Sequence, residues 1–382
     1  MHVAFITSEY PHSKVKNAAG IGTSIKNLAE ALVNLGVEIS IFIYGQEEND
    51  VFNENGISYH LISDKSYAFG KWYFYRKLLN KYINRFVEAE KITVIEAADW
   101  TGITAFMKFK VPSIIRFHGS DTYFCHIEQR KQKWKNFYFE KCAVKNADAL
   151  ITPTKFAGDL SRKLFNVSEK KYSTIHHGLN LENFYNSDPD NFQKGTLLYI
   201  GSLVRKKGVL EIPKIFRFLR EKVASAKLIL IGSDCPDIES GGESTWQVMQ
   251  KLFTSEEIKN VIYLGQIPYN NVKEHIMSAN VCIFPTFAET FGMVTIEAMA
   301  LQKAVVNSNI GWANELMEDG KSGYLVDPKD HRLYAERIAD ILEDDSVAFM
   351  LGKNAEEFVL AKFDIKNIAK ENLSFYQQIS TQ

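Results

Sequence analysis

Two glutamates, Glu289 and Glu297, lie eight residues apart in the segment FPTFAETFGMVTIEAMA. The apolar run VCIFP predicts a strand before them, and Pro285 prevents this strand from continuing as a central strand. The run GMVTIEAMALQ predicts a helix that begins near Phe291 or Gly292. The free amides of its first turn lie at the positive end of the helix dipole, so they attract an anion.

The two acids are better suited to hydroxyl groups than to that anion, because a carboxylate beside a phosphate would repel it. A sugar on one side and a ribose on the other would account for both acids. The alternative interpretation is structural, with one glutamate capping the helix and the other exposed on its surface.

A basic loop occurs in YIGSLVRKKGVLEI, where Arg205, Lys206 and Lys207 lie between a predicted strand and a predicted helix. Gly201 ends the strand and Gly208 opens the helix. Three cations on such a loop suit a diphosphate, because Arg binds two oxygens at once and Lys acts as a point charge. A solvated basic turn is the alternative.

Gly20 and Gly22 precede a predicted helix in AAGIGTSIKNLAEAL. Backbone amides at such a turn can approach a phosphate or an acceptor closely. The segment only half matches the dinucleotide-binding pattern, because a third glycine is missing and IFIYGQ lacks the acid expected after the second strand. A plain loop-to-helix turn stays open as the alternative.

His118 follows the predicted strand in SIIRFHGSD. An imidazole at the carboxyl end of a strand can donate a hydrogen bond or accept a proton. The alternative is a structural polar turn.

The elements that position these residues alternate between short β-rich runs and helical patterns, which is typical of parallel sheets covered by helices. Strands are predicted at 2–7, 37–44, 92–96, 112–117, 148–152, 172–176, 196–201, 226–232, 260–265, 281–285 and 303–308. Helices are predicted at 23–36, 71–89, 127–146, 155–164, 208–222 and 364–379.

The rhythm breaks in the Asn-, Asp- and Pro-rich segment NLENFYNSDPDNFQKG, which indicates a linker. We therefore expect two doubly wound α/β domains, at 1–182 and 196–362, joined by a linker at 183–195. A helix in 363–382 is expected to return to the N-terminal domain. Ligands of open parallel sheets bind at the carboxyl ends of the strands, so a central cleft faced by both domains is the expected site.

The composition, with 46% apolar and 24% charged residues, is that of an ordinary globular protein. We expect a cytoplasmic protein, because no apolar run is long enough to span a bilayer and the N-terminal stretch lacks a basic leader. The four cysteines include no CxxC pair, which is typical of reduced core thiols rather than of a zinc site.

The net charge of −1 hides an asymmetry. Residues 1–182 hold 24 Lys and Arg against 19 Asp and Glu, a net +5, and the remainder holds 21 against 27, a net −6. The segments FGKWYFYRKLLNKYINRF and RKQKWKNFYFEK combine cations with aromatic residues. Such segments can lie on the anionic inner face of the plasma membrane, cover a polar acceptor, or merely coat the domain. Nucleic acid fits less well, because no stacking motif or strong positive charge is present.

Together these segments resemble the retaining glycosyltransferases of family 4, which have the GT-B fold, over nearly the whole chain. The similar segments, in order, are AGIGTSIKNLAEALVNLGVEIS, IIRFHGSD, EKCAVKNADALITPTKFAGDL, IHHGLNLENF, YIGSLVRKKGV and ETFGMVTIE. The resemblance implies transfer of a hexosyl unit from a nucleotide diphosphate sugar, most often a UDP-sugar, to a glycan or lipid-linked acceptor hydroxyl. Cell-surface polysaccharide biosynthesis is the expected setting.

The resemblance also implies roles for residues of the C-terminal half. Lys207 matches the lysine on the diphosphate, Glu297 the glutamate on the ribose, and Glu289 the acid near the donor sugar. Ile267 in LGQIP would touch the base through its backbone. The expected contacts to the terminal phosphate come from the start of the predicted helix, at Phe291, Gly292, Met293, Val294 and Thr295.

In the N-terminal half, Gly20 matches the second glycine of the family's loop pair, with Gly22 in the same donor-binding loop. His118 matches the histidine beside the reacting sugar. Ala19 stands where the family has its first loop glycine, which narrows the freedom of the backbone.

A second departure is Ser202, which stands where the family has an arginine. Ser202 alone would bind phosphate more weakly, and we infer that Arg205 supplies the missing charge. His118, Glu289, Arg205 and Lys207 form the expected catalytic set.

The expected mechanism stabilises charge on the leaving diphosphate with Arg205, Lys207 and the helix amides, without a metal or other cofactor. The DxD at Asp188 and Asp190 falls in the predicted linker and is not expected to bind metal. Glu289 could serve as a nucleophile, as in retaining glycosidases. A front-face departure, in which the leaving phosphate takes the acceptor's proton, fits its hydroxyl contacts better.

Other functions share this architecture. Nucleotide-sugar epimerases lack the combination of spaced glutamates and a Lys-Gly pair, and glycan phosphorylases carry a pyridoxal lysine segment that does not occur in this chain. A non-enzymatic sugar-nucleotide-binding protein is the remaining alternative. The intact set of His118, Lys207, Glu289 and Glu297 argues against it.

Overall fold

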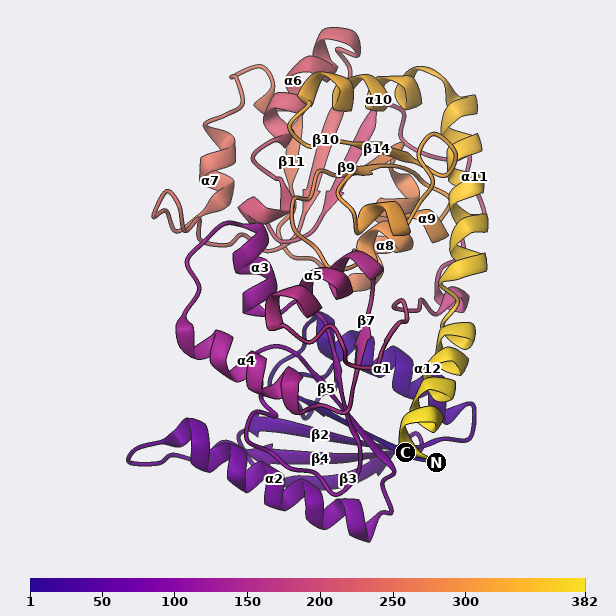
Figure 1. The fold of residues 1–382 in the computed structure, drawn as a ribbon. Helices are drawn as coiled ribbons and strands as arrows, with labels where there is room; N and C mark the ends of the chain where they lie inside the picture. The colour runs from indigo at the N-terminus through magenta and orange to yellow at the C-terminus, as the bar shows by residue number, and fades with distance from the viewer. Residues whose placement is uncertain (382) are drawn as a thin grey trace. The chain divides into compact units, whose positions relative to one another are not determined.

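The computed structural model describes residues 1–381 and divides the chain into two compact units. The first contains Met1–Asn180 together with the chain from Phe363 onward, and the second contains Leu181–Lys362 (Figure 1). Residues 183–195, predicted as a linker, therefore fall within the second unit. The last helix belongs to the first unit.

The first unit is built on an eight-stranded sheet with the order β3-β4-β2-β1-β5-β6-β7-β8. All neighbouring strands run parallel except the antiparallel pair β3 and β4. The bounds are β1 His2–Thr7, β2 Glu38–Gln46, β3 Asp50–Glu54, β4 Ile57–Ser63, β5 Val94–Ala98, β6 Ser113–Arg116, β7 Ala149–Thr152 and β8 Tyr172–Thr174.

Helices cover both faces of this sheet. The helix bounds are α1 Gly20–Val33, α2 Lys71–Ala89, α3 Asp121–Ile127, α4 Trp134–Asn146, α5 Lys155–Phe165 and α12 Ile365–Ser380. On α1, the buried residues Ile25, Leu28, Ala29 and Leu32 recur at helical spacing. They share a core with α12, while α2 contributes Leu79 to the core on the other face (Figure 1).

The helix predicted at 127–146 begins later, at Trp134, and a separate helix that the sequence did not predict, α3, precedes it at Asp121–Ile127. Ser120 starts the first, α3, by accepting a hydrogen bond from the Tyr123 amide. Gln129, with a φ of 53°, leaves the helical conformation, and the chain turns before α4 begins at Trp134.

The second unit has a six-stranded sheet with the order β11-β10-β9-β12-β13-β14, and all neighbours are parallel. The strand bounds are β9 Thr196–Ile200, β10 Lys227–Ile231, β11 Val261–Tyr263, β12 Val281–Phe284, β13 Ala304–Ser308 and β14 Tyr324–Val326. The order reverses between β9 and β12, and in doubly wound sheets ligands bind at such a reversal.

The helices of the second unit are α6 Ile212–Lys222, α7 Thr245–Gln250, α8 Tyr269–Ser278, α9 Met293–Ala300, α10 His331–Glu343 and α11 Asp345–Lys362. Short 3₁₀ turns lie at Leu181–Asn183, Arg205–Lys207, Ile258–Asn260 and Ala313–Glu315. Helix α9 begins where the sequence predicts it. The predicted doubly wound α/β fold is thus confirmed in each unit. Among residues 1–381, none of the helices combines the length and apolar character needed to cross a membrane.

Candidate functional site

Two loops at the sheet reversal of the second unit are hydrogen-bonded to each other. The loop after β9 carries Lys206, whose carbonyl accepts hydrogen bonds from the amides of Phe287 and Ala288 at 2.9 and 3.1 Å. Gly208 has a φ of +70°, and a Cβ there would meet the Pro285 carbonyl oxygen at 1.7 Å. Only glycine fits this approach, so the sequence itself fixes the basic loop against the loop after β12.

This approach pairs Lys207 with Glu289. The Lys207 ammonium binds Glu289 Oε2, and the Thr290 amide donates to the other carboxylate oxygen at 3.1 Å. Burial would raise the pKa of Glu289, but the adjacent Lys207 ammonium outweighs it and leaves the pKa below its usual value. Glu289 is therefore ionised at neutral pH. Sequence reasoning named both residues but not their pairing.

The start of α9 lies just beyond this pair in the chain. Its N-cap, Gly292, has a φ of +102°, a conformation that favours glycine. The Thr295 amide donates to the Gly292 carbonyl at 3.1 Å, and the Thr295 hydroxyl accepts from Asn307 at 3.2 Å. No hydrogen bond is recorded within residues 1–381 for the amides of Met293 and Val294. These two amides are therefore better placed than that of Thr295 to bind an anion. Phe291, the residue before Gly292, is buried.

Glu297 is buried on α9 and bound by a tyrosine. Tyr269 Oη donates to Glu297 Oε1 at 2.8 Å. Burial raises the pKa of Glu297, and the hydrogen bond from Tyr269 and the charge of Lys273 oppose this rise. Sequence reasoning missed Tyr269, which carries no motif. Ile267, expected at the base, lies half-buried two residues earlier.

Arg205 has acidic partners that the sequence did not indicate. Its guanidinium binds Asp237 through two hydrogen bonds, at 2.5 and 2.8 Å, and lies 3.0 Å from Glu239. Hydrogen bonding from Arg205 lowers the pKa of Asp237 to about 2. Ser202 is exposed, and its carbonyl accepts from Tyr199 Oη at 3.2 Å. That Arg205 compensates for Ser202 stays a prediction, and its charge already has two carboxylates nearby.

In the first unit, His118 follows β6 and its ring stacks on His177, with centroids 5.2 Å apart. The His118 amide donates to Asp99 Oδ1 at 2.8 Å. Burial and the charge of Arg116 lower the pKa of His118 to about 3, so its imidazole is neutral at physiological pH. A neutral imidazole can accept a proton or donate a hydrogen bond. The role beside the reacting sugar stays a prediction.

The glycine loop of the first unit leads into α1. Gly20 is exposed at the first residue of the helix, and the Gly22 amide donates to Glu9 Oε1 at 2.9 Å. Ser24 Oγ lies 3.0 Å from His177 Nδ1. The Glu9 carboxylate thus binds one amide in the first turn of α1. Through Ser24, α1 is also linked to the stacked rings of His118 and His177.

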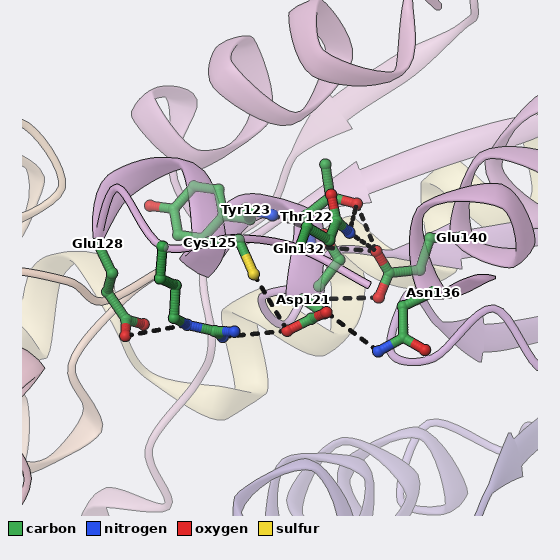
Figure 2. A network of polar contacts seen from close by, with 10 residues as sticks. Asp121, Thr122, Tyr123, Cys125, Glu128, Gln132, Asn136 and Glu140 are labelled. Carbon is green, nitrogen blue, oxygen red and sulfur yellow. Dashed lines mark hydrogen bonds and ion pairs between the residues drawn. The ribbon is translucent and has the colours of Figure 1, made fainter. Parts of the chain in front are cut away.

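A polar network holds the segment that follows His118 (Figure 2). The buried Glu140 of α4 accepts hydrogen bonds from the amides of Asp121 and Thr122, at 2.9 and 3.0 Å, and from the Thr122 hydroxyl. Asp121 in turn accepts from Asn136 at 3.0 Å. Glu140 therefore fixes the start of α3, although sequence reasoning did not single it out.

Within residues 1–381, no group of three or more His, Cys, Asp or Glu side chains is arranged to hold a metal ion. The four cysteines are free. Asp188 and Asp190, the DxD of the sequence, lie in the second unit before β9.

Comparisons with known proteins show which family the chain resembles. Residues 18–183 match the model of Glycosyltransferase Family 4, and residues 186–358 match the model of Glycosyl transferases group 1. An uncharacterized glycosyltransferase of Methanocaldococcus jannaschii is 26% identical over 401 residues, covering 99% of this chain and 98% of the relative. The capsular polysaccharide biosynthesis glycosyltransferase CapM of Staphylococcus aureus is 32% identical over 192 residues, 49% of this chain and 46% of CapM.

Solved structures show the same fold. Sucrose-phosphate synthase from Thermosynechococcus elongatus has a TM-score of 0.81 at 23% identity, covering 99% of this chain and 98% of that chain. HepE of Anabaena in complex with UDP has a TM-score of 0.73 at 16% identity, covering 99% and 100%. At these identities the likeness establishes the GT-B fold alone. The two family models together span both units, and the chain therefore belongs to the family 4, group 1 glycosyltransferases.

Proposed function

We propose that this glycosyltransferase moves a hexosyl unit from a UDP-sugar to a hydroxyl of a glycan or lipid-linked acceptor, with retention of anomeric configuration. The observation that carries the proposal is the Lys207–Glu289 ion pair, held within the second unit by the loop that leads into α9. The UDP complex of HepE supports UDP as the nucleotide. The name of CapM supports a polysaccharide setting.

In the proposed donor complex, Lys207 and the Met293 and Val294 amides bind the diphosphate. Glu297 accepts hydrogen bonds from the ribose hydroxyls, and Glu289 from those of the transferred sugar. A carboxylate suits hydroxyl donors because an ionised acceptor roughly doubles the strength of a hydrogen bond.

The proposed chemical step is a front-face departure. The bond between the anomeric carbon and the phosphate oxygen breaks, and the acceptor oxygen bonds to that carbon on the same face. The acceptor's proton passes to the leaving phosphate. Lys207 and the α9 amides stabilise the charge that develops on the diphosphate, and this stabilisation is the main source of catalysis that we assign to the site. These groups can meet that need without a metal ion.

Donor binding and turnover test the proposal separately. Saturation-transfer NMR against UDP-, GDP- and ADP-sugars is expected to give the strongest signal for a UDP-sugar. NMR of the product formed by slow hydrolysis should show the donor's anomeric configuration. An inverted product would contradict retention, interconversion of donor sugars would indicate an epimerase, and binding without turnover would indicate an inactive scaffold.

A further inference from the structure

A group of exposed aromatic side chains gathers on the first unit. We call this group the aromatic surface. Its members, each more than a third exposed, are Phe69, Trp72, Tyr73, Phe74, Phe106 and Tyr138. They come from the loop before α2, from α2 itself, from the segment after β5 and from α4. A contiguous patch of exposed apolar side chains on a protein surface marks an interaction site.

Ring contacts make this surface continuous. Phe106 lies 5.8 Å from Trp72 and 5.9 Å from Tyr138, measured between ring centroids. Phe74 lies 5.6 Å from Tyr73 and 6.1 Å from Phe69. Tyr73 also lies 6.3 Å from Phe106, which joins these two groups of rings. The aromatic surface is therefore one patch rather than scattered residues.

The patch rests on a fixed base. The Trp72 ring stacks on Phe139, and the Arg76 guanidinium covers the same ring at 4.4 Å. Buried Arg76 also donates to the carbonyls of Trp72 and Gly102, at 2.7 and 3.1 Å. The exposed rings are thus held outward by buried contacts.

Cations continue the aromatic surface along α2. Lys77, Lys81 and Arg85 follow Tyr73 at intervals of four residues and are exposed, so they share one helix face. No ion pair is recorded for these three side chains within residues 1–381. The first acid of α2 is Glu88, and it pairs with Lys110. We call the three cations the basic stripe.

We infer that the aromatic surface and the basic stripe dock the enzyme onto an anionic lipid bilayer. Trp and Tyr favour the headgroup region, and each Lys or Arg near an anionic surface adds to the attraction. The unpaired basic stripe favours this partner over a neutral glycan, which offers no charge to it. The inference deepens the proposed function, because docking would bring the enzyme to a lipid-linked acceptor.

Sedimentation of the full chain with vesicles tests the inference. We expect pelleting with phosphatidylcholine mixed with phosphatidylglycerol, little pelleting with phosphatidylcholine alone, and release at high salt, because salt screens the attraction. Lipids brominated on their acyl chains should also quench tryptophan fluorescence, with a smaller effect in Trp72→Phe, since Trp72 of α2 is the tryptophan of the aromatic surface and is 45% exposed.

Three variants separate the contributions. The variant Lys77→Gln, Lys81→Gln, Arg85→Gln should lower the partition onto anionic vesicles on the order of 100-fold, since each cation contributes about fivefold. Phe69→Ser combined with Tyr73→Ser should lower it at least about tenfold, because both side chains are exposed members of the aromatic surface. The control removes the same charge from exposed positions of the second unit, in Lys227→Gln, Lys251→Gln, Lys353→Gln, and should pellet like the wild type.

Donor hydrolysis in vesicle-free solution should be unchanged in all three variants, which shows that they are folded. The inference is overturned if the wild type does not pellet with anionic vesicles, or if the first two variants pellet as it does. Binding to an anionic polysaccharide without vesicle binding would overturn it in favour of a glycan surface. If the wild type self-associates but does not bind vesicles, and the aromatic variant no longer self-associates, the inference is overturned and the partner is a second copy of the chain. Vesicle binding without donor hydrolysis would contradict the proposed function and leave the docking surface standing.

Discussion

The hydroxyl of Tyr269 donates a hydrogen bond of 2.8 Å to Glu297, and so fixes one oxygen of a buried carboxylate in the second unit. This contact gives Glu297 a side-chain partner, whereas the sequence indicated only its expected role at the ribose. The tyrosine orients the carboxylate and favours its ionised form, because a hydrogen bond to the charged form lowers a pKa.

Tyr269→Phe should therefore weaken UDP binding in a pH-dependent way. Burial raises the pKa of Glu297 and Tyr269 opposes the rise, so removing the hydroxyl should raise the pKa further. If the ribose needs the ionised form, affinity falls as the pH drops through this pKa, and the midpoint should move to higher pH in the variant. Calorimetric titration with UDP across pH should show this shift, with a loss on the order of tenfold at low pH. An equal loss at every pH would indicate a purely structural role.

Glu289→Gln should cut turnover sharply while leaving UDP affinity roughly intact. The carboxylate is assigned to the sugar hydroxyls, so its loss should lower kcat on the order of 100-fold, the typical cost of one electrostatic contact to the transition state. Single-turnover rates and UDP titration measure the two effects. A loss of UDP binding equal to the loss of rate would contradict the assignment.

Lys207→Met should show the complementary pattern, with a loss of both UDP affinity and rate. Lys207 is the cation that the proposal places on the diphosphate, and its removal leaves Glu289 without its counter-charge. Lys227→Met, at an exposed position of β10, removes the same charge and should change neither quantity. If both variants behaved alike, Lys207 would not contact the donor.

The sequence predicted the elements whose apolar pattern is continuous, such as α2 and the buried strands, because burial on one or both faces imposes that pattern. It missed the hairpin of β3 and β4, although Asn55 and Gly56 form a turn with φ values of 51° and 78°, as type I′ hairpins require. The edge strand β3 is largely exposed and therefore lacks a clear apolar alternation.

The candidate site was predictable in its motif residues and not in their partners. Lys207, Glu289 and Glu297 follow strands or begin a helix, and parallel sheets bring such positions to one edge. Tyr269 and Asp237 are linked to the site by tertiary contacts across many residues. No local spacing encodes such contacts.

Substitutions of Arg205 and Asp237 distinguish two roles for Arg205, because the two roles predict opposite effects of Asp237→Asn. If the pair positions the basic loop, Arg205→Gln and Asp237→Asn should both lower kcat/KM several-fold by displacing Lys207. If Arg205 instead binds the diphosphate, Asp237→Asn should free its charge and tighten UDP binding. We expect the first pattern, because Arg205 already binds Asp237 through two hydrogen bonds.

The same pair makes the stability of the protein depend on pH, because Arg205 lowers the pKa of Asp237 to about 2 in the folded protein. The stability that the pair adds is present above the pKa that Asp237 has in the unfolded chain, and it is lost as the pH falls towards 2.

Replacing Glu96 should destabilise the last helix, α12, more than the rest of the first unit. Arg116 binds Glu96 at 2.7 and 2.9 Å, and Glu96 also accepts from Tyr376 on α12 at 2.6 Å. Glu96→Gln leaves a buried guanidinium without its counter-charge, so we expect a loss of about 3 kcal/mol in the free energy of unfolding. Hydrogen exchange of the α12 amides should speed up accordingly. Asp159→Asn, which breaks an exposed pair with Lys155, should cost less than about 1 kcal/mol. If α12 exchanged equally fast in both variants, packing against α1 rather than this ion pair would hold it in place.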